Sequence, residues 1–308
     1  MTEADAAPAA DLGQDGRTIR LGVDFGGTKI EAATLDMDGR VLRTLRVANP
    51  GGYDAAIEAV RDLANVLSPA GTPIGLGGPG SPSPATGLIR NANSTWLNGR
   101  NFAADLGAAT GRAVRVANDA NCFALSEAVD GAAAGARVVF GVIVGTGVGG
   151  GIVVDGQLMT GAGGVAGEWG HIPLPWAQPD EHPGPKCWCG LHGCMETWAS
   201  GPALERDYGQ GVRAQEIVAR ARSGEGAARA ALDRYISRLG RGLAAICNIL
   251  DPDAIVLGGG MSNVEELYVA LPGVMAPYLF TDRPEVRVVR NRHGDASGVR
   301  GAAWLWPR

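Results

Sequence analysis

Two glycine turns, each between two strand-like segments, constrain the fold of this chain more than any other feature. Residues 18–25 have the pattern of a buried strand, Gly26 and Gly27 of a tight turn, and residues 28–36 of a second strand. From Arg137 the pattern begins again, with VVFGVIV, the turn GTGVGGG and IVV. The sequence therefore predicts an internal duplication with a repeat of about 120 residues, too long for a solenoid and typical of two related lobes.

Strands and helices alternate in both halves, which predicts an α/β fold with mixed sheets. The expected strands beyond the two hairpins cover residues 41–47, 73–77, 113–117, 254–257 and 285–290, and the expected helices cover 54–67, 101–110, 119–133, 212–223, 227–250 and a last one from about Ser297. The helix at 54–67 places six residues at helical spacing for one buried face, namely Ala56, Ile57, Val60, Leu63, Ala64 and Leu67.

The repeat also predicts the domain organisation. We expect a small lobe at residues 18–117 and a large lobe at 118–295, with the C-terminal helix within 296–308 packed back on the small lobe. Residues 1–17 are small, polar and acidic, and we expect them to form a disordered tail.

Composition excludes several classes of function. The net charge of -5 over 308 residues leaves no basic field for nucleic acid, and no apolar run reaches the length of a membrane span. The N-terminus lacks the basic start and apolar stretch of a secretory signal, so we expect a cytoplasmic protein. In that reducing compartment the five cysteines are expected to be thiols or metal ligands.

Glycine, at 48 residues, is clustered beside strands in a way that suggests backbone surfaces for close approach by a ligand. Bare N–H groups in such turns can bind phosphate oxygens. The alternative is that each glycine only supplies a positive φ. The three candidate turns are Gly26, Gly27 and Thr28; Gly145, Thr146 and Gly147; and Gly258, Gly259 and Gly260, the last of which precedes a predicted helix.

No Walker loop and no dinucleotide fingerprint occurs in the sequence. Duplicated lobes with phosphate-binding hairpins resemble instead the ribonuclease H-like ATPase architecture of actin, the seventy-kilodalton chaperones and sugar kinases. That likeness implies ATP with Mg²⁺ as co-substrate, with Asp24 near the magnesium ion. Lys29 has two open interpretations, one facing phosphate and one facing solvent.

Asn118 and Asp119 mark the point where a predicted strand gives way to a helix. Both residue types cap helices, which is one explanation. The carboxyl end of a strand is also where α/β folds bind ligands, so Asp119 is a candidate base for a sugar hydroxyl, and Asn118 a partner for a neighbouring hydroxyl. We expect the helix N-terminus to lower the pKa of Asp119, which phosphoryl transfer tolerates because positioning and charge neutralisation dominate its loose transition state.

Further polar residues suit the walls of a carbohydrate site. The NANSTW segment contributes Asn91, Asn93 and Ser94, with Trp96 offering an apolar face to a sugar ring; the alternative is an ordinary Asn- and Ser-rich turn. Glu168 in GEWGH and Glu196 after the cysteines are candidate hydroxyl ligands, although an isolated acid is more often a surface residue.

The segment CWCGLHGC at residues 187–194 carries three thiols within eight residues, a density typical of a zinc site. Four protein ligands would make the metal structural. The thiols are Cys187, Cys189 and Cys194, and the fourth ligand is a histidine or an acid, with His171, His182 and His192 all near in sequence. Cys122 and Cys247 lie on apolar helical stretches and are expected in the core.

In order, DFGGTK, NDAN, GTGVGGG, GEWGH, CWCGLHGC and LGGGMS resemble the ROK family, named for repressors, open reading frames and kinases. The likeness runs from about Thr18 to the C-terminus. It implies a homodimer, Asp119 as the general base, and a zinc-binding knuckle at 171–194 in which His171 joins the cysteines. The residues it implies for sugar binding are Asn93, Asn118, Glu168, His171 and Glu196.

Four segments, NANSTWLNG, EAVDGAAAGA, GEWGHIPLPW and HGDASGVRGAAWLWP, look most like bacterial ROK fructokinases that also accept mannose. The expectation is therefore transfer of phosphate to the C6 hydroxyl of fructose. The alternatives are an N-acetylglucosamine kinase or glucokinase of the same family, a sugar sensor without chemistry, and an actin-like or chaperone ATPase.

Two departures from the family pattern are Gly78 before Pro-Gly and the short acidic tail, which is too short for the winged helix of ROK repressors.

Overall fold

The computed structural model describes residues 19–306, so the tail predicted at 1–17 lies outside the described residues. The chain forms two compact units. The first extends to Asp130 and includes Leu158–Ala166 and the segment from Asp295; the second comprises Gly131–Gln157 and Gly167–Gly294. The first boundary therefore lies after Asp130 rather than at 117, because helix α3 (Asp119–Val129) packs against helix α9 (Ser297–Ala303) of the same unit.

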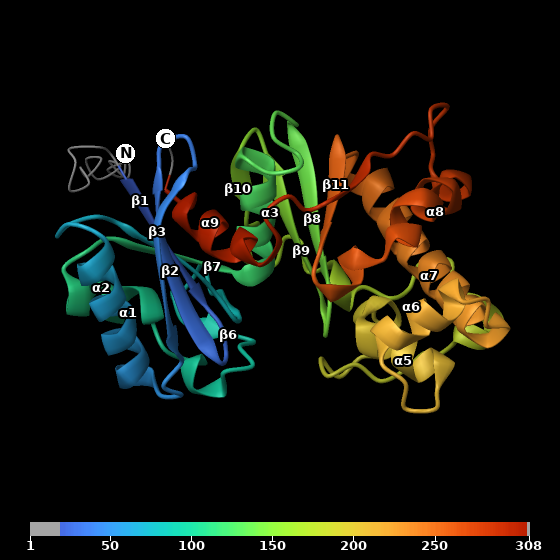
Figure 1. Ribbon diagram of the computed structural model, residues 1–308, viewed down its shortest axis with the longest axis horizontal. Helices are drawn as coiled ribbons and strands as arrows, with labels where there is room; N and C mark the ends of the chain where they lie inside the picture. The colour runs from blue at the N-terminus through green and yellow to red at the C-terminus, as the bar shows by residue number, and fades with distance from the viewer. Residues whose placement is uncertain (1–18, 307–308) are drawn as a thin grey trace. The chain divides into compact units, whose positions relative to one another are not determined.

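The first unit is built on a five-stranded mixed sheet in the order β3-β2-β1-β4-β7 (Figure 1). Strand β1 pairs antiparallel with β2 and parallel with β4, which in turn pairs parallel with β7. The bounds are β1 Ile19–Phe25, β2 Lys29–Asp36, β3 Val41–Ala48, β4 Ile74–Gly78 and β7 Val114–Asn118, and a small ladder joins β5 Ser81–Pro82 to β6 Ile89–Arg90.

Helices cover this sheet through two different kinds of packing. Helix α1 (Tyr53–Leu67) buries the same six residues that its periodicity placed on one face, and these pack with side chains of β1 such as Leu21 and Val23. Helix α2 (Phe102–Thr110) adds Phe102 and Leu106 to that core. Helix α9 packs directly on strand glycines, because a side chain at Gly22 or Gly75 would collide with its backbone. These glycines serve helix packing and not ligand approach.

The second unit repeats the topology, with a sheet in the order β10-β9-β8-β11-β12. Strand β8 pairs antiparallel with β9 and parallel with β11, as β1 does with β2 and β4. Aligning Gly22 with Gly141 brings the bounds of β1 and β8 into coincidence, which confirms the predicted duplication. The bounds are β8 Val138–Val144, β9 Val148–Val154, β10 Gln157–Met159, β11 Ala254–Gly258 and β12 Val288–Arg290.

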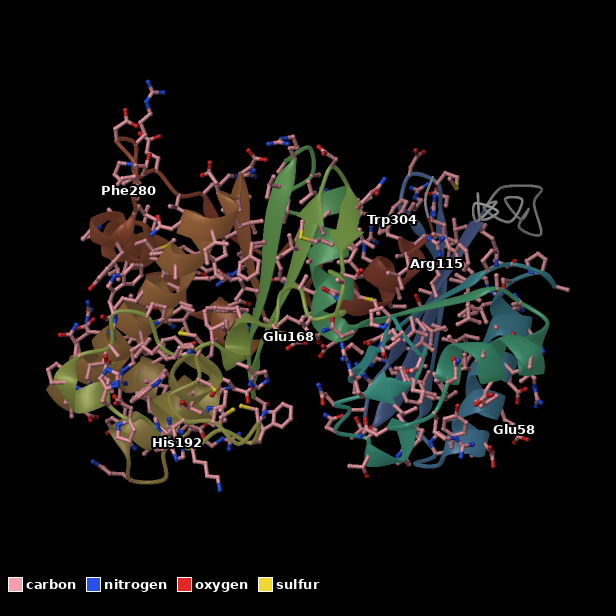
Figure 2. The ribbon with its side chains drawn as sticks, turned by 180° about the vertical axis from the view of Figure 1, so that it is seen from behind. Glu58, Arg115, Glu168, His192, Phe280 and Trp304 are labelled. Atoms are coloured by element: carbon pink, nitrogen blue, oxygen red, sulfur yellow. The ribbon has the colours of Figure 1, made fainter. Side chains whose placement is uncertain are left out.

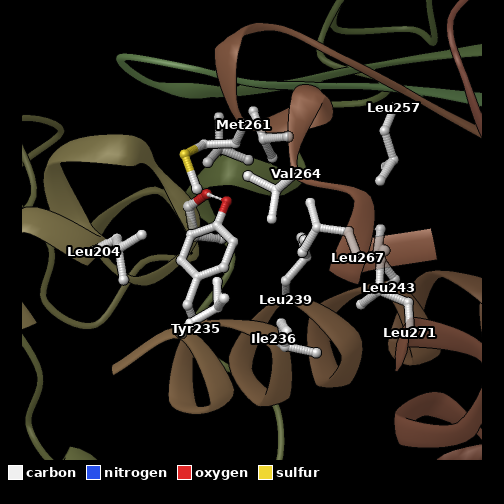
Figure 3. Packing of buried hydrophobic residues seen from close by; sticks show 14 of the residues in the cluster. Leu204, Tyr235, Ile236, Leu239, Leu243, Leu257, Met261, Val264, Leu267 and Leu271 are labelled. Carbon is white, nitrogen blue, oxygen red and sulfur yellow. Dashed lines mark hydrogen bonds between the residues drawn. The ribbon is translucent and has the colours of Figure 1, made fainter. Parts of the chain in front are cut away.

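The hydrophobic core of the second unit is larger than that of the first and is formed mainly by helices (Figure 3). Its centre is the long helix α7 (Gly226–Leu250), whose Tyr235 is fully buried and donates a hydrogen bond of 2.8 Å to the carbonyl of Ala199. The turn at 258–260 leads first into a 3₁₀ segment, Gly260–Asn263, and the predicted α-helix begins after it, at Glu265. The helices are α4 Glu196–Ala199, α5 Gly201–Tyr208, α6 Ala214–Arg222, α7 Gly226–Leu250 and α8 Glu265–Met275.

The 3₁₀ turn Pro179–Glu181, which precedes the cysteine-rich segment (residues 187–194), is tied to helix α7 (Gly226–Leu250) by a buried ionic cluster, here called the Glu181 cluster (Glu181, Asp207, Arg238 and Arg241). Both oxygens of Glu181 accept hydrogen bonds of 2.8 Å from Arg241, and one also accepts from Arg238 at 2.8 Å. Arg238 in addition donates to Asp207 at 2.8 Å.

Every helix within residues 19–306 is too short or too polar to span a lipid bilayer.

Candidate functional site

The residues predicted for function fall into two groups, one in each unit. The first unit holds the predicted base, one glycine turn and the asparagines; the second holds two glycine turns, two glutamates and the metal ligands. The first group is Asp24, Gly26, Gly27, Thr28, Lys29, Asn93, Asn118 and Asp119; the second is Gly145, Thr146, Gly147, Glu168, His171, Cys187, Cys189, Cys194, Glu196, Gly258, Gly259 and Gly260.

In the first unit, the parallel register brings the acidic residues to one edge of the sheet. Asp24 pairs with Gly77 across β1 and β4, and Gly78 pairs with Asn118 across β4 and β7. The pKa of Asp24 is raised to about 6, first by burial and second by the negative charge of Asp119. Two carboxylates that oppose each other's ionisation in this way are suited to a shared divalent cation.

Asn118 and Asp119 begin helix α3, as the sequence predicts. Asn118 caps the helix, since its side-chain oxygen accepts from the N–H of Asn121 at 2.7 Å. The Asp119 carboxylate accepts from the N–H of Ala120 at 2.8 Å and keeps accessible surface.

The predicted lowering of the Asp119 pKa is wrong. Desolvation by the surrounding protein raises this pKa and outweighs the backbone N–H groups that lower it. A raised pKa and an accessible carboxylate are compatible, because desolvation depends on a wider shell of protein than the contact surface does. Asp119 is consequently a stronger base than the helix terminus alone would make it.

The turn at Gly26–Thr28 closes β1 onto β2 through a hydrogen bond of 2.9 Å from the N–H of Gly26 to the carbonyl of Lys29. Gly27 has no positive φ, and a side chain added there would meet no atom within 4 Å. Neither backbone strain nor packing therefore requires glycine at position 27. The Lys29 ammonium lies 3.8 Å from Glu31, and its side chain is 41% exposed.

The loop that carries Asn93 is anchored on both sides. Asn98 bonds both the N–H and the carbonyl of Ala92, at 2.9 and 3.0 Å, and Gly80 packs so tightly under Ala92 that a side chain there would collide. Asn93 itself is exposed and caps the N–H of Ser94 at 2.8 Å. Trp96 packs edge-on against Phe25, at 6.0 Å between ring centres, and so contributes to the core.

In the second unit, two glycine turns meet at the ends of neighbouring parallel strands. The register pairs Gly258 with Ile143, so the turn after β11 lies beside the turn after β8. Gly259 has a positive φ of 79°. This residue therefore fits the alternative interpretation, in which each turn glycine only supplies a positive φ. Gly145, Gly147 and Gly260 do not have positive φ, so that interpretation fails for them.

The GEWGH motif is pressed against β9. Side chains at Gly167 or Gly170 would collide with the carbonyls of Gly150 and Val148, and the indole of Trp169 donates to the carbonyl of Gly149 at 2.9 Å. The glycines thereby fix the backbone on either side of Glu168, which lies exposed beside the strands of the second sheet (Figure 2).

Glu196 connects the glycine turn to the cysteine-rich segment. One carboxylate oxygen accepts from the N–H of Val148 at 3.1 Å, and the other accepts from the indole of Trp188 at 2.6 Å. A side chain at Gly147 would lie 2.7 Å from a carboxylate oxygen of Glu196, so the carboxylate would have to move from this position.

The four residues His171, Cys187, Cys189 and Cys194 form a candidate metal centre, with ligand atoms within 4.8 Å of one another. Nδ1 of His171 lies 3.6 Å from the sulfur of Cys187, and the sulfurs of Cys189 and Cys194 are also 3.6 Å apart. Metal–sulfur bonds of about 2.3 Å place tetrahedral ligands roughly 3.7 Å apart, so this set fits zinc.

Among the described residues, the geometry selects His171 from the three histidines near the cysteines in sequence. His192 lies in the cysteine-rich segment (Figure 2) but is not part of the group, and neither is His182. The pKa of Cys194 is raised to about 12, first by burial and then by the neighbouring thiols of Cys189 and Cys187, as expected for thiols that need a bound cation to ionise together.

Two residues with contacts at the site were not singled out by the sequence. Asn49 bonds the first glycine turn, and Trp188 bonds Glu196. Trp188 lies inside the cysteine motif, and that position is its only signal in the sequence, because its 67% exposure is visible only in the structure. Asn49 carries no sequence signal beyond its place before Pro50.

Comparison with known proteins agrees with this arrangement. A sequence profile described as the ROK family matches residues 20–308. An N-acetyl-D-glucosamine kinase of Citrobacter koseri is 40% identical over 296 residues, which cover 92% of this chain and 98% of the relative. Two solved structures are similar over 94% of this chain: a ROK hexokinase from Thermus thermophilus (33% identity, TM-score 0.82, 97% of that chain) and a ROK family glucokinase from Streptomyces griseus in complex with glucose and AMPPNP (30% identity, TM-score 0.73, 99% of that chain).

Proposed function

Because the chain belongs to the ROK family, we propose that this sugar kinase transfers the γ-phosphoryl group of ATP to the 6-hydroxyl of a hexose, with N-acetylglucosamine as its preferred sugar. The observation that carries the choice of sugar is the 40% identity, over nearly the full length of both chains, to an enzyme named for that substrate. The fructose and mannose specificity expected from short sequence stretches has less support.

The chemistry divides between the two units. In the first, Asp119 accepts the proton of the attacking hydroxyl, Asn118 and Asn93 hold the sugar, and Asp24 faces the magnesium ion of Mg-ATP. The accessible carboxylate and raised pKa of Asp119 support its role as a base. In the second, Glu168, His171 and Glu196 are the proposed ligands of sugar hydroxyls, and the turns at Gly145–Gly147 and Gly258–Gly260 are proposed ligands of the nucleotide. Gly26–Thr28 has the same proposed role in the first unit.

The metal centre is proposed to hold one structural zinc ion. Its four protein ligands would complete a tetrahedron and leave no position for substrate or water. The ion would fix the cysteine-rich segment beside GEWGH. The homodimer implied by the resemblance stays a prediction.

Steady-state kinetics on metal-replete protein test the proposed function. We expect kcat/KM with Mg-ATP to be at least about 10-fold higher for N-acetylglucosamine than for glucose, fructose or mannose, because a site that hydrogen-bonds the amide leaves buried polar groups unpaired with the other sugars. A preference for fructose would overturn the choice of sugar and leave the kinase assignment intact. Hexose binding by calorimetry without ADP formation for any sugar would overturn the kinase assignment.

Zinc content is expected to be about one ion per chain and to depend on all three thiols. Cys189→Ser should lose most of the metal and unfold at a lower temperature, because it removes one ligand from an exposed position without disturbing the core. The measurement is elemental analysis of purified protein with a thermal melt. Cys247→Ser is the control and should retain full zinc; equal zinc in both variants would contradict the proposed ligand set.

A further inference from the structure

Asn49 lies beside the first glycine turn because of the pairing of β2 with β3. Lys29, the first residue of β2, pairs with Ala48, the last residue of β3. Asn49 follows directly and is partly buried against the turn.

Asn49 donates hydrogen bonds to the carbonyls of Gly26 and Thr28, the two residues on either side of Gly27. Its side-chain amide donates to the carbonyl of Gly26 at 2.7 Å, and its backbone N–H donates to the carbonyl of Thr28 at 2.9 Å. Its side-chain oxygen accepts from the N–H of Gly51 at 3.0 Å, which fixes the orientation of the amide.

These bonds determine which way the turn's peptide groups face. In a trans peptide the carbonyl of one residue and the N–H of the next point in opposite directions. With the Gly26 carbonyl directed at Asn49, the N–H of Gly27 is directed away from it. That N–H donates to no atom of residues 19–306, and the space beside Gly27 is open.

The second hairpin has the same feature by a different means. Gly145 is the counterpart of Gly26 in the duplication, and its carbonyl accepts a hydrogen bond of 2.7 Å from the N–H of Gly201. In both units, then, the carbonyl of the first turn glycine is engaged by a donor from outside the hairpin. In the first hairpin Gly26 and Gly27 follow one another and resist rotation of the peptide between them only weakly, so an external donor is what keeps the Gly26 carbonyl away from the open side.

We propose that Asn49 is a positioning residue for nucleotide: it holds the Gly26–Gly27 peptide so that the Gly27 N–H faces a phosphate oxygen of ATP. The inference rests on the proposed function, since it takes Gly26–Thr28 as part of the ATP site. Loss of the Asn49 side chain would free the peptide to rotate and present a carbonyl to the phosphate.

The test is Asn49→Leu, which keeps the approximate size of the side chain and removes its polar atoms. We expect the KM for ATP and the dissociation constant for the nonhydrolysable analogue AMPPNP to rise about 10-fold, the usual effect of losing one hydrogen bond to a charged group, with the KM for the hexose unchanged. Asn248→Leu is the matched control, because Asn248 clamps a loop of the second unit through the Tyr278 carbonyl (2.8 Å) and the Phe280 N–H (3.0 Å). This control should lose stability without a change in nucleotide affinity.

Unchanged AMPPNP binding in Asn49→Leu would overturn the inference, and so would equal rises in the KM values for ATP and hexose, which would indicate a general structural role. Failure of the proposed function has a different signature. Wild-type protein would then bind AMPPNP yet phosphorylate no hexose, and the comparison of AMPPNP affinities would still decide the role of Asn49.

Discussion

Asp119→Asn is expected to reduce kcat by about 10²- to 10⁴-fold, the usual contribution of a positioned general base. Asparagine keeps the shape of the side chain and can still accept the hydrogen bond from the Ala120 N–H. It cannot accept the proton of the sugar hydroxyl. The KM for the hexose should change little, and a coupled ADP assay with direct binding of sugar separates the two effects.

The matched control is Asp54→Asn, which makes the same substitution in the first turn of helix α1, and its kcat should stay within about twofold of wild type. The pH profile gives a second readout. Because desolvation raises the pKa of Asp119, kcat/KM should fall on acidification at a higher pH than an ordinary aspartate would give. Full turnover by Asp119→Asn would contradict its role as the base.

Glu181→Gln is expected to lower the free energy of unfolding by about 3–5 kcal/mol, because it removes the negative partner of two buried guanidinium groups. The side chains of Arg241 and Arg238 are 2% and 8% exposed, so neither can recover full hydration. Urea unfolding followed by tryptophan fluorescence measures the loss. Asp233→Asn is the control: it breaks an exposed ion pair between Asp233 and Arg229 of helix α7. This substitution should lower the free energy of unfolding by less than about 0.5 kcal/mol.

The same carboxylate predicts a pH dependence of stability. Burial alone would raise the pKa of Glu181, but hydrogen bonds from Arg241 and Arg238 lower it from 4.5 to about 2. A depressed pKa means that the stabilisation is fully present above pH 4.5 and is lost as the pH falls toward 2. Glu181→Gln should lack this acid-dependent loss, and a variant that follows the wild-type pH curve would contradict the role given to Glu181.

The hairpins and the buried face of α1 could be predicted because each is set by local periodicity. The sequence was less informative where tertiary contacts decide. The helix expected at 119–133 ends at Val129, the strand expected at 285–290 is only Val288–Arg290, and α5 (Gly201–Tyr208) begins with a Gly-Pro pair that reads as a loop. At Gly22 and Gly75 the need for glycine comes from α9, which packs on both positions although it lies far from them in the sequence.

For the candidate site, sequence identified residue types but not their environments. The spacing of the cysteines indicated zinc, yet it could not choose among three histidines, because that choice depends on how GEWGH packs on β9. The direction of the Asp119 pKa shift was missed because it is set by burial in the folded protein, which the spacing of residues does not show. The choice between fructose and N-acetylglucosamine depends on the placement of single polar groups, which short motifs do not encode.

The most direct test of the central claim is a crystal structure with N-acetylglucosamine and AMPPNP bound together. The account predicts an Asp119 carboxylate oxygen within about 3 Å of the sugar's 6-hydroxyl, with that hydroxyl in line with the γ-phosphorus. An Asp119 side chain that contacts only its own helix, with another residue at the 6-hydroxyl, would contradict it.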